Sequence, residues 1–279
     1  MTKKLPRVAA VHDISGYGKC SLTVAIPLLS AAGIEVCPVV TATLSTNTLF
    51  PNFTFYDMTD HMRTCIAHWR KLGLRFESVY SGFLGSAEQI GLVMDLIRNF
   101  ESGVSVVDPV MGDHGKVITT YTKEMCDKMA DLVAVADVVT PNITEACLLM
   151  GRPYAGPSLD KAESEALCRG VKSGGAKNVV LTGVIRGDKL YNCVLEESGK
   201  YFESEIGLLD FNMHGTGDLF TSTLTAALVR GYTLADAVAS AALFVRDAMV
   251  FSRDVEDVME RGVAFEPLLH KLHSGVYLG

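Results

Sequence analysis

The stretch HGTGDLF, residues 214–220, combines a glycine-rich turn with a carboxylate at the start of an apolar helical pattern. Gly215, Thr216 and Gly217 would direct successive backbone N–H groups toward one point at a helix N-terminus, where the helix dipole adds partial positive charge. Asp218 could accept the proton of a substrate hydroxyl while an O–P bond forms. The residues predict phosphoryl transfer, although a plain turn with a dipole-complementing aspartate is the alternative.

Two further acidic residues follow strand-like segments. Asp108 ends an apolar run in DPVMGD, and Glu145 opens a helical pattern after Asn142 in TPNITE. Carboxylate oxygens are hard ligands that hold Mg²⁺ directly or through its waters, and Mg²⁺ would bridge the phosphates of ATP. A turn aspartate before proline and a favourable charge in a first helical turn are the simpler interpretations. Three acidic positions at strand ends together favour a magnesium site.

The peptide HDISGYGKCS begins at His12 and superficially resembles a phosphate-binding loop. The P-loop motif requires glycine, four residues, then Gly-Lys-Ser/Thr, but here Asp13 stands at the first glycine and Cys20 at the last position. We therefore interpret the peptide as a turn that brings a strand end close to a small ligand. His12, Asp13 and Ser15 become candidate substrate contacts, and Lys19 is expected to be a solvated residue at a helix start.

The elements that must position these residues alternate between strand and helix patterns. Such alternation predicts a mostly parallel sheet with helices on both faces, in which ligands bind at the carboxyl ends of the strands. Ser86 and Gln89 are spaced as a capping box, and FTFYD is expected to be a short strand outside the main sheet. Strands, some with the turn that follows, are predicted at 8–11, 34–42, 78–85, 104–113, 136–142 and 178–184, and helices at 21–33, 86–100, 214–231 (after a turn) and 234–252.

Composition limits the class of protein. The chain has 279 residues and no linker-like stretch, so we expect a single domain over residues 1–279. A net charge of −7 argues against nucleic acid or an anionic membrane as partner. Seven scattered cysteines without a C-x-x-C pair, and no signal peptide or transmembrane pattern, predict a cytoplasmic protein. No zinc-site or G-x-S-x-G pattern occurs.

Four stretches, DPVMGD, TPNITEA, SGFLGSAEQI and HGTGDLF, together resemble the ribokinase superfamily and its vitamin B6 (pyridoxal/pyridoxamine) kinase branch. The likeness covers nearly the whole chain. It implies a ribokinase-like three-layer α/β/α fold with a central, mostly parallel sheet. It also implies ATP-dependent phosphorylation of the 5′-hydroxymethyl group of pyridoxal, pyridoxamine or pyridoxine, a homodimer, Mg²⁺ and often a monovalent cation such as K⁺.

The resemblance assigns roles to residues on the phosphate side. Asp218 becomes the catalytic base, and Gly215, Thr216 and Gly217 form an anion hole. Asp108 and Glu145 fall on the magnesium positions. The ATP-binding positions are Asp108, Asn142, Glu145 and Thr182.

The resemblance also assigns substrate-side residues, with some departures from the family pattern. His12 stands where the branch commonly has a serine at the pyridine ring, so Asp13 or Ser15 would take over the polar contact. Thr48 in STNT matches a substrate-side threonine. Phe83 stands where the family has an aromatic residue, commonly tyrosine, near the ring. Taken without the resemblance, these positions would be turn residues, a core phenylalanine and a strand-end histidine.

Two other functions remain open. One is a hydroxymethylpyrimidine kinase of thiamine synthesis, whose substrate also carries a ring hydroxymethyl group. The other is a non-catalytic B6-binding or carrier protein, although Asp218, Asp108 and Glu145 would then have no task. A lid that excludes water is also expected, either around Gly115 and Lys116 or at FTFYD.

Overall fold

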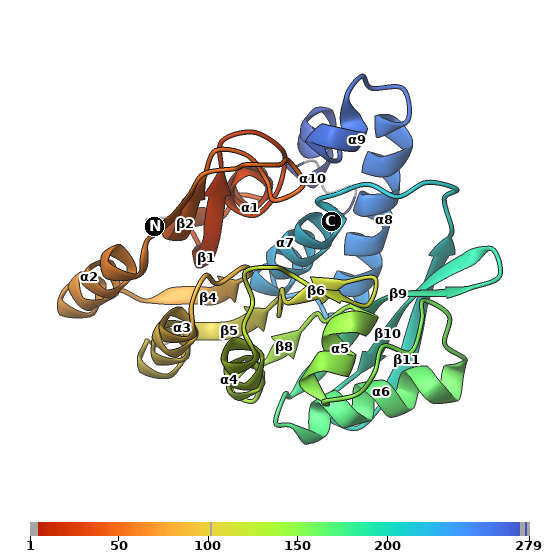
Figure 1. The fold of residues 1–279 in the computed structure, drawn as a ribbon, viewed down its shortest axis with the longest axis horizontal. Helices are drawn as coiled ribbons and strands as arrows, with labels where there is room; N and C mark the ends of the chain where they lie inside the picture. Colours follow the sequence, from red (N-terminus) through yellow and green to blue (C-terminus); the bar gives the residue numbers. More distant parts are fainter. Residues whose placement is uncertain (1–4, 101, 274–276, 278–279) are drawn as a thin grey trace.

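One nine-stranded sheet organises the chain in a computed structural model that describes residues 5–100, 102–273 and 277 (Figure 1). The strand order is β11-β10-β9-β8-β5-β4-β1-β2-β3. A separate two-stranded hairpin joins β6 and β7. The strands are β1 (Arg7–Ser15), β2 (Glu35–Leu44), β3 (Phe55–Asp57), β4 (Phe76–Ser81), β5 (Ser102–Val107), β6 (Gly112–Asp113), β7 (Lys116–Val117), β8 (Val138–Val139), β9 (Asn178–Arg186), β10 (Lys189–Leu195) and β11 (Tyr201–Gly207).

The six inner strands from β9 to β2 run parallel, whereas β3, β10 and β11 are antiparallel additions at the two edges. The expectation that FTFYD lies outside the main sheet is wrong. Asp57 pairs with Ala42 and Phe55 pairs with Leu44. The polar stretch after β2 lets the chain reverse, and the open edge of β2 offers unpaired backbone groups that this short strand satisfies.

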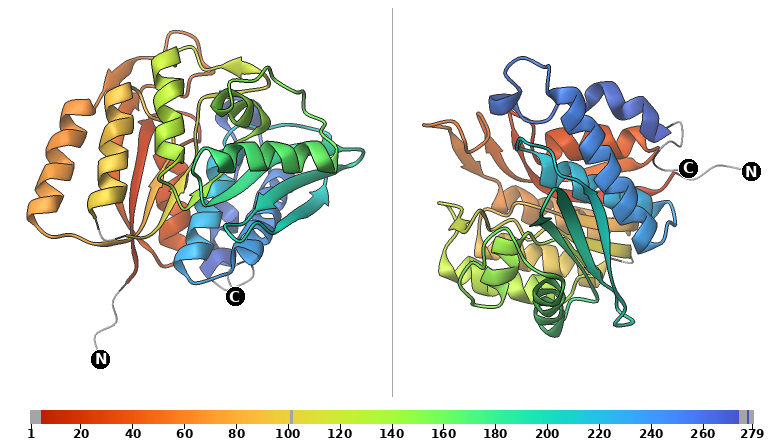
Figure 2. Two further views of the ribbon diagram at one scale, coloured as in Figure 1. Left: turned by 90° about the horizontal axis from the view of Figure 1, so that it is seen from below. Right: turned by 90° about the vertical axis from the view of Figure 1, so that its right-hand side faces the viewer.

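Helices cover both faces of the sheet, which makes three layers (Figures 1 and 2). One layer holds α2 to α6, and Figure 2 shows α2, α3 and α4 lying nearly parallel to one another. The other layer holds α1, α7, α8 and α10. The helices are α1 (Leu22–Ala31), α2 (Thr59–Lys71), α3 (Ala87–Asn99), α4 (Lys123–Val133), α5 (Ile143–Leu149), α6 (Lys161–Ser173), α7 (Thr216–Val229), α8 (Leu234–Ser252), α9 (Val258–Arg261), the 3₁₀ turn Glu266–Leu268 and α10 (Leu269–His273).

Each face of the sheet carries its own hydrophobic core because both are covered. Val8 and Tyr80 pack on the α1, α7 and α8 side, while Ala9 and Val79 pack on the α2 to α4 side. Neighbouring strand residues therefore point into different cores, as is typical of parallel strands that are apolar on both faces. The predicted three-layer α/β fold with a mostly parallel sheet is confirmed.

The predicted capping box at α3 forms only in part. Ser86 caps the helix by accepting from the Gln89 N–H, but the Gln89 side chain does not return to Ser86. Its amide instead accepts from the Gly85 N–H and donates to the Thr41 carbonyl. Gln89 is fully buried, so its amide serves a tertiary contact between α3 and β2 that outweighs the local motif.

The sheet draws on strands from residue 7 to residue 207, and we infer from this that the chain folds as one domain. Residues 1–4, 101, 274–276 and 278–279 of the predicted span lie outside the described residues. Within the described part of the chain, no helix is long and apolar enough to cross a membrane.

Candidate active site

A cavity of about 540 Å³ opens at the carboxyl ends of β1, β5, β8 and β9. Ligand sites commonly have volumes of ~300–1,000 Å³. Parallel strands end at a common edge, which is why residues distant in sequence meet there. The predicted residues that line this cavity are Asp13, Ser15, Thr48, Phe83, Asp108, Asn142, Glu145, Thr182, Gly215, Thr216, Gly217 and Asp218.

The predicted anion hole lies at the N-terminus of α7. Gly215 is its N-cap, with a left-handed backbone at φ 83° and ψ 2°. A Cβ atom there would lie 2.6 Å from the Lys19 carbonyl oxygen, so a side chain would collide with the loop after β1. The Leu219 N–H donates to the Gly215 carbonyl and opens the helical ladder. The preceding N–H groups have no helical acceptor, as at every helix N-terminus, and stand at the cavity.

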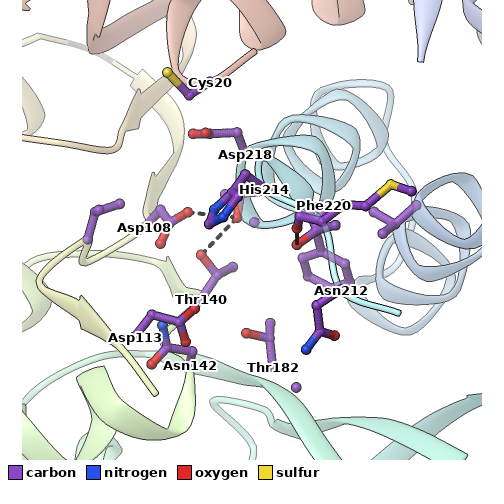
Figure 3. A pocket seen from close by; sticks show the side chains of 18 of the residues that line it. Cys20, Asp108, Asp113, Thr140, Asn142, Thr182, Asn212, His214, Asp218 and Phe220 are labelled. Carbon is purple, nitrogen blue, oxygen red and sulfur yellow. Dashed lines mark hydrogen bonds between the residues drawn. The ribbon is translucent and has the colours of Figure 1, made fainter. Parts of the chain in front are cut away.

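Asp218 occupies the first turn of the same helix, partly exposed to the cavity (Figure 3). The pKa of its carboxyl is raised to about 6, chiefly by burial; the Ser21 N–H opposes the shift by donating a hydrogen bond, and the charge of Asp13 adds to it. The ordinary aspartate pKa is ~3.9. A carboxylate with a raised pKa is a stronger proton acceptor than an exposed one, and above pH 6 it is still ionised.

Asp108 ends β5 beside Asp218 (Figure 3). Burial raises the pKa of its carboxyl to about 8, and the nearby charge of Asp218 adds to the shift. The Thr221 hydroxyl donates to the Asp108 carboxylate at 3.3 Å and lies 3.0 Å from the Thr140 hydroxyl. Thr221 follows Asp218 on α7, so this chain of hydroxyls connects the helix to the ends of β5 and β8.

Glu145 and Asn142 form a true capping box at the start of α5. The Glu145 carboxylate accepts from the N–H groups of Asn142 at 2.9 Å and Met111 at 3.2 Å. Burial and the charge of Asp108 hold the pKa of Glu145 well above its usual range. The Asn142 amide accepts from the Glu145 N–H and donates to the Gly112 carbonyl. Both polar ends of Asn142 are thus engaged in holding α5 against the β6–β7 hairpin.

The lining of the cavity carries more acid than base. Its carboxylates are Asp13, Asp108, Asp113, Glu145 and Asp218. Among the described residues, its lysine and arginine are Lys19 and Arg246, which pair with Glu266 and Asp247, each at 2.8 Å. A phosphate chain could enter this lining only together with a cation.

The donor set of the cavity fits a magnesium ion. No group of three or more His, Cys, Asp or Glu side chains in the described part of the chain is placed to hold a metal by itself. Mg²⁺ does not need such a cage, because it keeps several waters and commonly binds one or two carboxylates together with substrate phosphates. Asp108, with Glu145 nearby, offers oxygen ligands of this kind.

The substrate-side residues gather at the ends of β1, β2 and β4. The pairing of β1 with β2 shifts register between His12 and Ile14, so Asp13 lies at a bulge. The extra residue belongs to β2, so the alternation of side chains along β1 is unbroken, and Asp13 and Ser15 face the same way. Asp13 lies buried at the cavity wall, and the Ser15 hydroxyl is 3.5 Å from its carboxylate.

Thr48 is exposed at the cavity mouth, and Phe83 is buried in the cavity wall with its ring centroid 6.1 Å from that of Tyr121. Thr182, in β9, lines the opposite wall of the cavity, where its hydroxyl lies 3.5 Å from the Pro141 carbonyl.

The prediction that His12 contacts substrate is not supported by its position. The side chain is fully buried, and it is absent from the described lining of the cavity. Its ring packs against Tyr80 at 4.3 Å between centroids, and a Cβ on Gly82 would lie 2.3 Å from Nδ1. Residue 12 alternates with Val11 and Asp13 along β1, so its side chain points, like that of Val8, into the core on the α1 and α7 side. Burial lowers the pKa of its imidazole to about 3, so the ring is neutral.

The expectation that Lys19 is solvated is also wrong. Its side chain is 17% exposed, forms an ion pair with Glu266 and lies over the Phe265 ring. The partner residues come from a segment more than 240 residues away, so the local sequence around Lys19 contained no signal for this contact.

Sequence reasoning also missed an apolar wall. It lies between α8 and the segment that follows β11, and its side chains are Ile206, Leu208, Leu209, Phe211, Val245 and Met249. Ala242, Val245, Arg246 and Met249 recur at helical spacing, but that pattern is the same as for a helix face packed on a core. His214 and Asn212, which precede the predicted anion hole, line the cavity too (Figure 3).

The β6–β7 hairpin, one of the two segments considered as a lid, is tied to its surroundings. The Gly115 N–H donates to the Thr144 hydroxyl at 2.9 Å, and the Tyr154 ring packs against Gly115. Asp113 and His114 at its turn are exposed beside the cavity. A closing motion of this hairpin stays a prediction.

The raised pKa of Asp218 predicts a pH-dependent effect of Asp218→Asn on stability. The folded-state pKa of about 6 lies above the ordinary value of 3.8, so ionised Asp218 destabilises the fold above pH 6 and this penalty disappears below about pH 4. The variant should raise the Tm by a few degrees at pH 8 and leave it nearly unchanged at pH 4, by calorimetry. A lower Tm at pH 8 would contradict the unpaired burial of this carboxylate.

Comparison with known proteins agrees with this geometry. Residues 26–261 match the phosphomethylpyrimidine kinase family. A structure of a proposed phosphomethylpyrimidine kinase from Bacteroides thetaiotaomicron is 37% identical, with a TM-score of 0.92 over 98% of this chain and 95% of that chain. A second crystal form of the Bacteroides protein contains pyridoxal. Pyridoxal kinase from Lactobacillus plantarum is 29% identical, with a TM-score of 0.89 over 97% of this chain and 98% of that chain.

A curated relative points to pyrimidine chemistry. The hydroxymethylpyrimidine/phosphomethylpyrimidine kinase of Haemophilus influenzae is 31% identical over 173 residues, which span 60% of this chain and 63% of that enzyme. The match therefore covers less than two thirds of the relative's length. The family match extends over residues 26–261, which is most of the chain, so the assignment to a family does not depend on this relative. The chain belongs to the phosphomethylpyrimidine kinase family, and its fold is that of the ribokinase-like pyridoxal kinases.

Proposed function

We propose that the protein transfers the γ-phosphoryl group of ATP to the 5′-hydroxymethyl group of a vitamin B6 vitamer, pyridoxal, pyridoxamine or pyridoxine. The observation that carries the proposal is that one turn of α7 presents to the cavity both the Asp218 carboxylate, with its raised pKa, and the N–H groups of Gly215, Thr216 and Gly217. In one helical turn, the carboxylate can accept the proton of an alcohol while the N–H groups bind the phosphoryl group that the alcohol attacks.

The reaction proceeds by in-line displacement at the γ-phosphorus. The substrate hydroxyl oxygen forms the new O–P bond, the bond to the ADP oxygen breaks, and the hydroxyl proton passes to the Asp218 carboxylate. The N–H groups of the α7 turn stabilise the charge on the transferring phosphoryl oxygens, since they are fixed before the reaction begins. Phe83 and the Asp13–Ser15 pair hold the ring so that its hydroxymethyl group faces Asp218.

The nucleotide lies on the opposite side of the same cavity. The apolar wall between α8 and the segment after β11 supplies a slot for a flat base, and Thr182 lies along the path toward the phosphates. Asp108 and Glu145 would hold Mg²⁺, directly or through waters, and the Asn142 amide links the start of α5 to the Gly112 carbonyl of β6. When bound, Mg²⁺ supplies the positive charge that the lining of the cavity lacks.

The substrate is the least constrained part of the proposal, and a hydroxymethylpyrimidine kinase is the second candidate. The Haemophilus relative favours the pyrimidine, whereas the pyridoxal in the Bacteroides crystal and the Lactobacillus enzyme favour the vitamer. A non-catalytic B6 carrier is a weaker candidate, because three buried carboxylates destabilise a fold and binding alone does not need them. A homodimer, a K⁺ requirement and a cytoplasmic location stay predictions.

The substrate proposal predicts a clear order in a turnover assay. ADP release with MgATP should be fastest with a B6 vitamer, and the kcat/KM for hydroxymethylpyrimidine should be at least about tenfold lower, the effect of ~1.4 kcal/mol of transition-state discrimination. Pyridoxal, pyridoxamine, pyridoxine and hydroxymethylpyrimidine are assayed in parallel. Turnover with the pyrimidine alone would move the assignment to the second candidate, and vitamer binding without turnover would favour the carrier.

The base role of Asp218 predicts a selective loss in Asp218→Asn. The kcat should fall by ~10²–10⁴-fold, the usual contribution of a positioned proton acceptor. Nucleotide affinity, measured by calorimetry with ADP, should change little because the N–H groups of the turn remain.

A matched control separates this role from that of a dipole-complementing carboxylate. Asp236 occupies the same third position of α8, where it is hydrogen-bonded to its N-cap Thr233 and lies outside the cavity lining. Asp236→Asn should leave the kcat unchanged. Equal activity of the two variants would remove Asp218 from the base role.

The magnesium assignment predicts a shifted metal requirement in Asp108→Asn. The Mg²⁺ concentration that gives half-maximal turnover should rise by ~10–100-fold, comparable with the loss of other positioned groups around a metal. The measurement is a Mg²⁺ titration of the initial rate at fixed ATP, with Asp131→Asn as control because Asp131 is exposed on α4 and lies outside the cavity lining. An unchanged half-maximal concentration in Asp108→Asn would contradict the assignment.

A further inference from the structure

The segment at the end of α9, residues 261–266, is hydrogen-bonded to both sides of the cavity entrance. The Lys19 N–H donates to the Arg261 carbonyl at 2.7 Å, and the Val263 N–H donates to the His214 carbonyl at 3.1 Å. Lys19 belongs to the loop between β1 and α1, and His214 directly precedes the predicted anion hole. One C-terminal segment therefore fixes two loops that lie about 200 positions apart in the sequence.

Gly262 lies between these two hydrogen bonds and allows the close approach. Its backbone has φ 89° and ψ 175°, a conformation that is essentially confined to glycine. A Cβ atom at this position would lie 3.1 Å from the His214 carbonyl oxygen and 3.1 Å from the Lys19 carbonyl oxygen. A Cβ atom on Gly215 would also lie close to the Lys19 carbonyl oxygen, at 2.6 Å. Three backbone segments thus pack together with no side chain between them.

The side chain of Lys19 strengthens this junction. Its Nζ lies 2.8 Å from the Glu266 carboxylate and 5.7 Å from the centroid of the Phe265 ring. A lysine held in this way secures the loop to the C-terminal segment, and its charge is already compensated before any phosphate binds.

The contacts continue to the substrate side of the cavity. The Arg261 guanidinium lies 5.9 Å from the centroid of the Tyr17 ring, and the Tyr17 carbonyl accepts from the Asn47 N–H at 2.9 Å. Asn47 precedes Thr48, the proposed substrate contact. The same segment therefore reaches the loop that faces the alcohol and the turn that faces the phosphate.

We propose that residues 261–266 form a brace that positions the anion hole relative to the substrate loop, with Gly262, Lys19 and Glu266 as positioning residues. This inference rests on the proposed kinase function. None of residues 261–266, all of which the structure describes, lines the cavity, so they act through Lys19, His214 and Tyr17. Geometry matters here because a displacement of ~1 Å in a reacting constellation can cost ~10²-fold in rate.

Gly262→Ala tests the brace directly. The added methyl group would push on the two carbonyl oxygens, so kcat should fall by about tenfold or more, while the KM values and the affinity for ADP change less than about twofold. Gly231→Ala is the control, since Gly231 has φ 88° but nothing within 4 Å of its Cβ position. An equal kcat in the two variants, assayed well below their Tm values, would overturn the proposal.

Glu266→Gln distinguishes the brace from a direct phosphate contact by Lys19, and it is a surface change that leaves the fold intact. The brace predicts a severalfold lower kcat, unchanged ADP affinity, and near wild-type kcat in Lys19→Arg, which keeps the ion pair. If Lys19 instead binds phosphate, its release from Glu266 would tighten ADP binding. Tighter ADP binding with an unchanged kcat would overturn the brace.

Amide hydrogen exchange gives a readout that does not depend on turnover. The Lys19 and Val263 amides, which donate the two brace hydrogen bonds, should exchange faster in Glu266→Gln than in the wild type and in Gly231→Ala. If the wild type phosphorylates no alcohol, the proposed function fails. The exchange rates would still show whether residues 261–266 hold the two loops in place. Unchanged exchange of both amides would contradict it.

Discussion

The gathering of carboxylates around the strand ends, with no lysine or arginine of the described cavity lining left to pair with them, is the constraint on which the rest of the site depends. Asp108, Glu145 and Asp218 each have a raised pKa because burial disfavours the charged form and because they repel one another. Lys19 and Arg246 relieve none of this, since each already has its own carboxylate partner. Such an arrangement costs stability in the protein without ligand, and a cation bound beside the carboxylates, as proposed for Mg²⁺, would reduce the cost.

The scaffold holds these groups with hydrogen bonds rather than charges. Backbone N–H groups of Met111 and Asn142 fix Glu145, and the hydroxyls of Thr140 and Thr221 form a chain that ends on Asp108. These donors orient each carboxylate but leave it short of compensating charge. The same principle applies at α7, where the N–H groups that would receive a phosphate are fixed by the helix and by the contact of Gly215 with the first loop.

The sequence allowed the fold and most of the lining to be predicted because both follow local rules. Strand–helix alternation predicts the parallel sheet, and polar residues at strand ends meet at one edge. His12 was misjudged because its role came from a family position, whereas alternation along β1 places it on the opposite face from Asp13 and Ser15. Lys19 was misjudged because Glu266 approaches it only through the tertiary fold. The apolar wall on α8 was missed because a face that binds a ligand and one that packs on a core have the same spacing.

The most direct test of this account is a ¹³C NMR titration of the aspartate carboxyl groups in the metal-free protein. The account predicts one resonance that titrates near pH 6, is missing in Asp218→Asn, and moves to a lower pKa when Mg²⁺ and a non-hydrolysable ATP analogue are added. Positive charge near the carboxylate would produce that downward shift. Titration of every aspartate below about pH 4.5 in the empty protein would contradict the claim that the site is built from carboxylates that lack a cation.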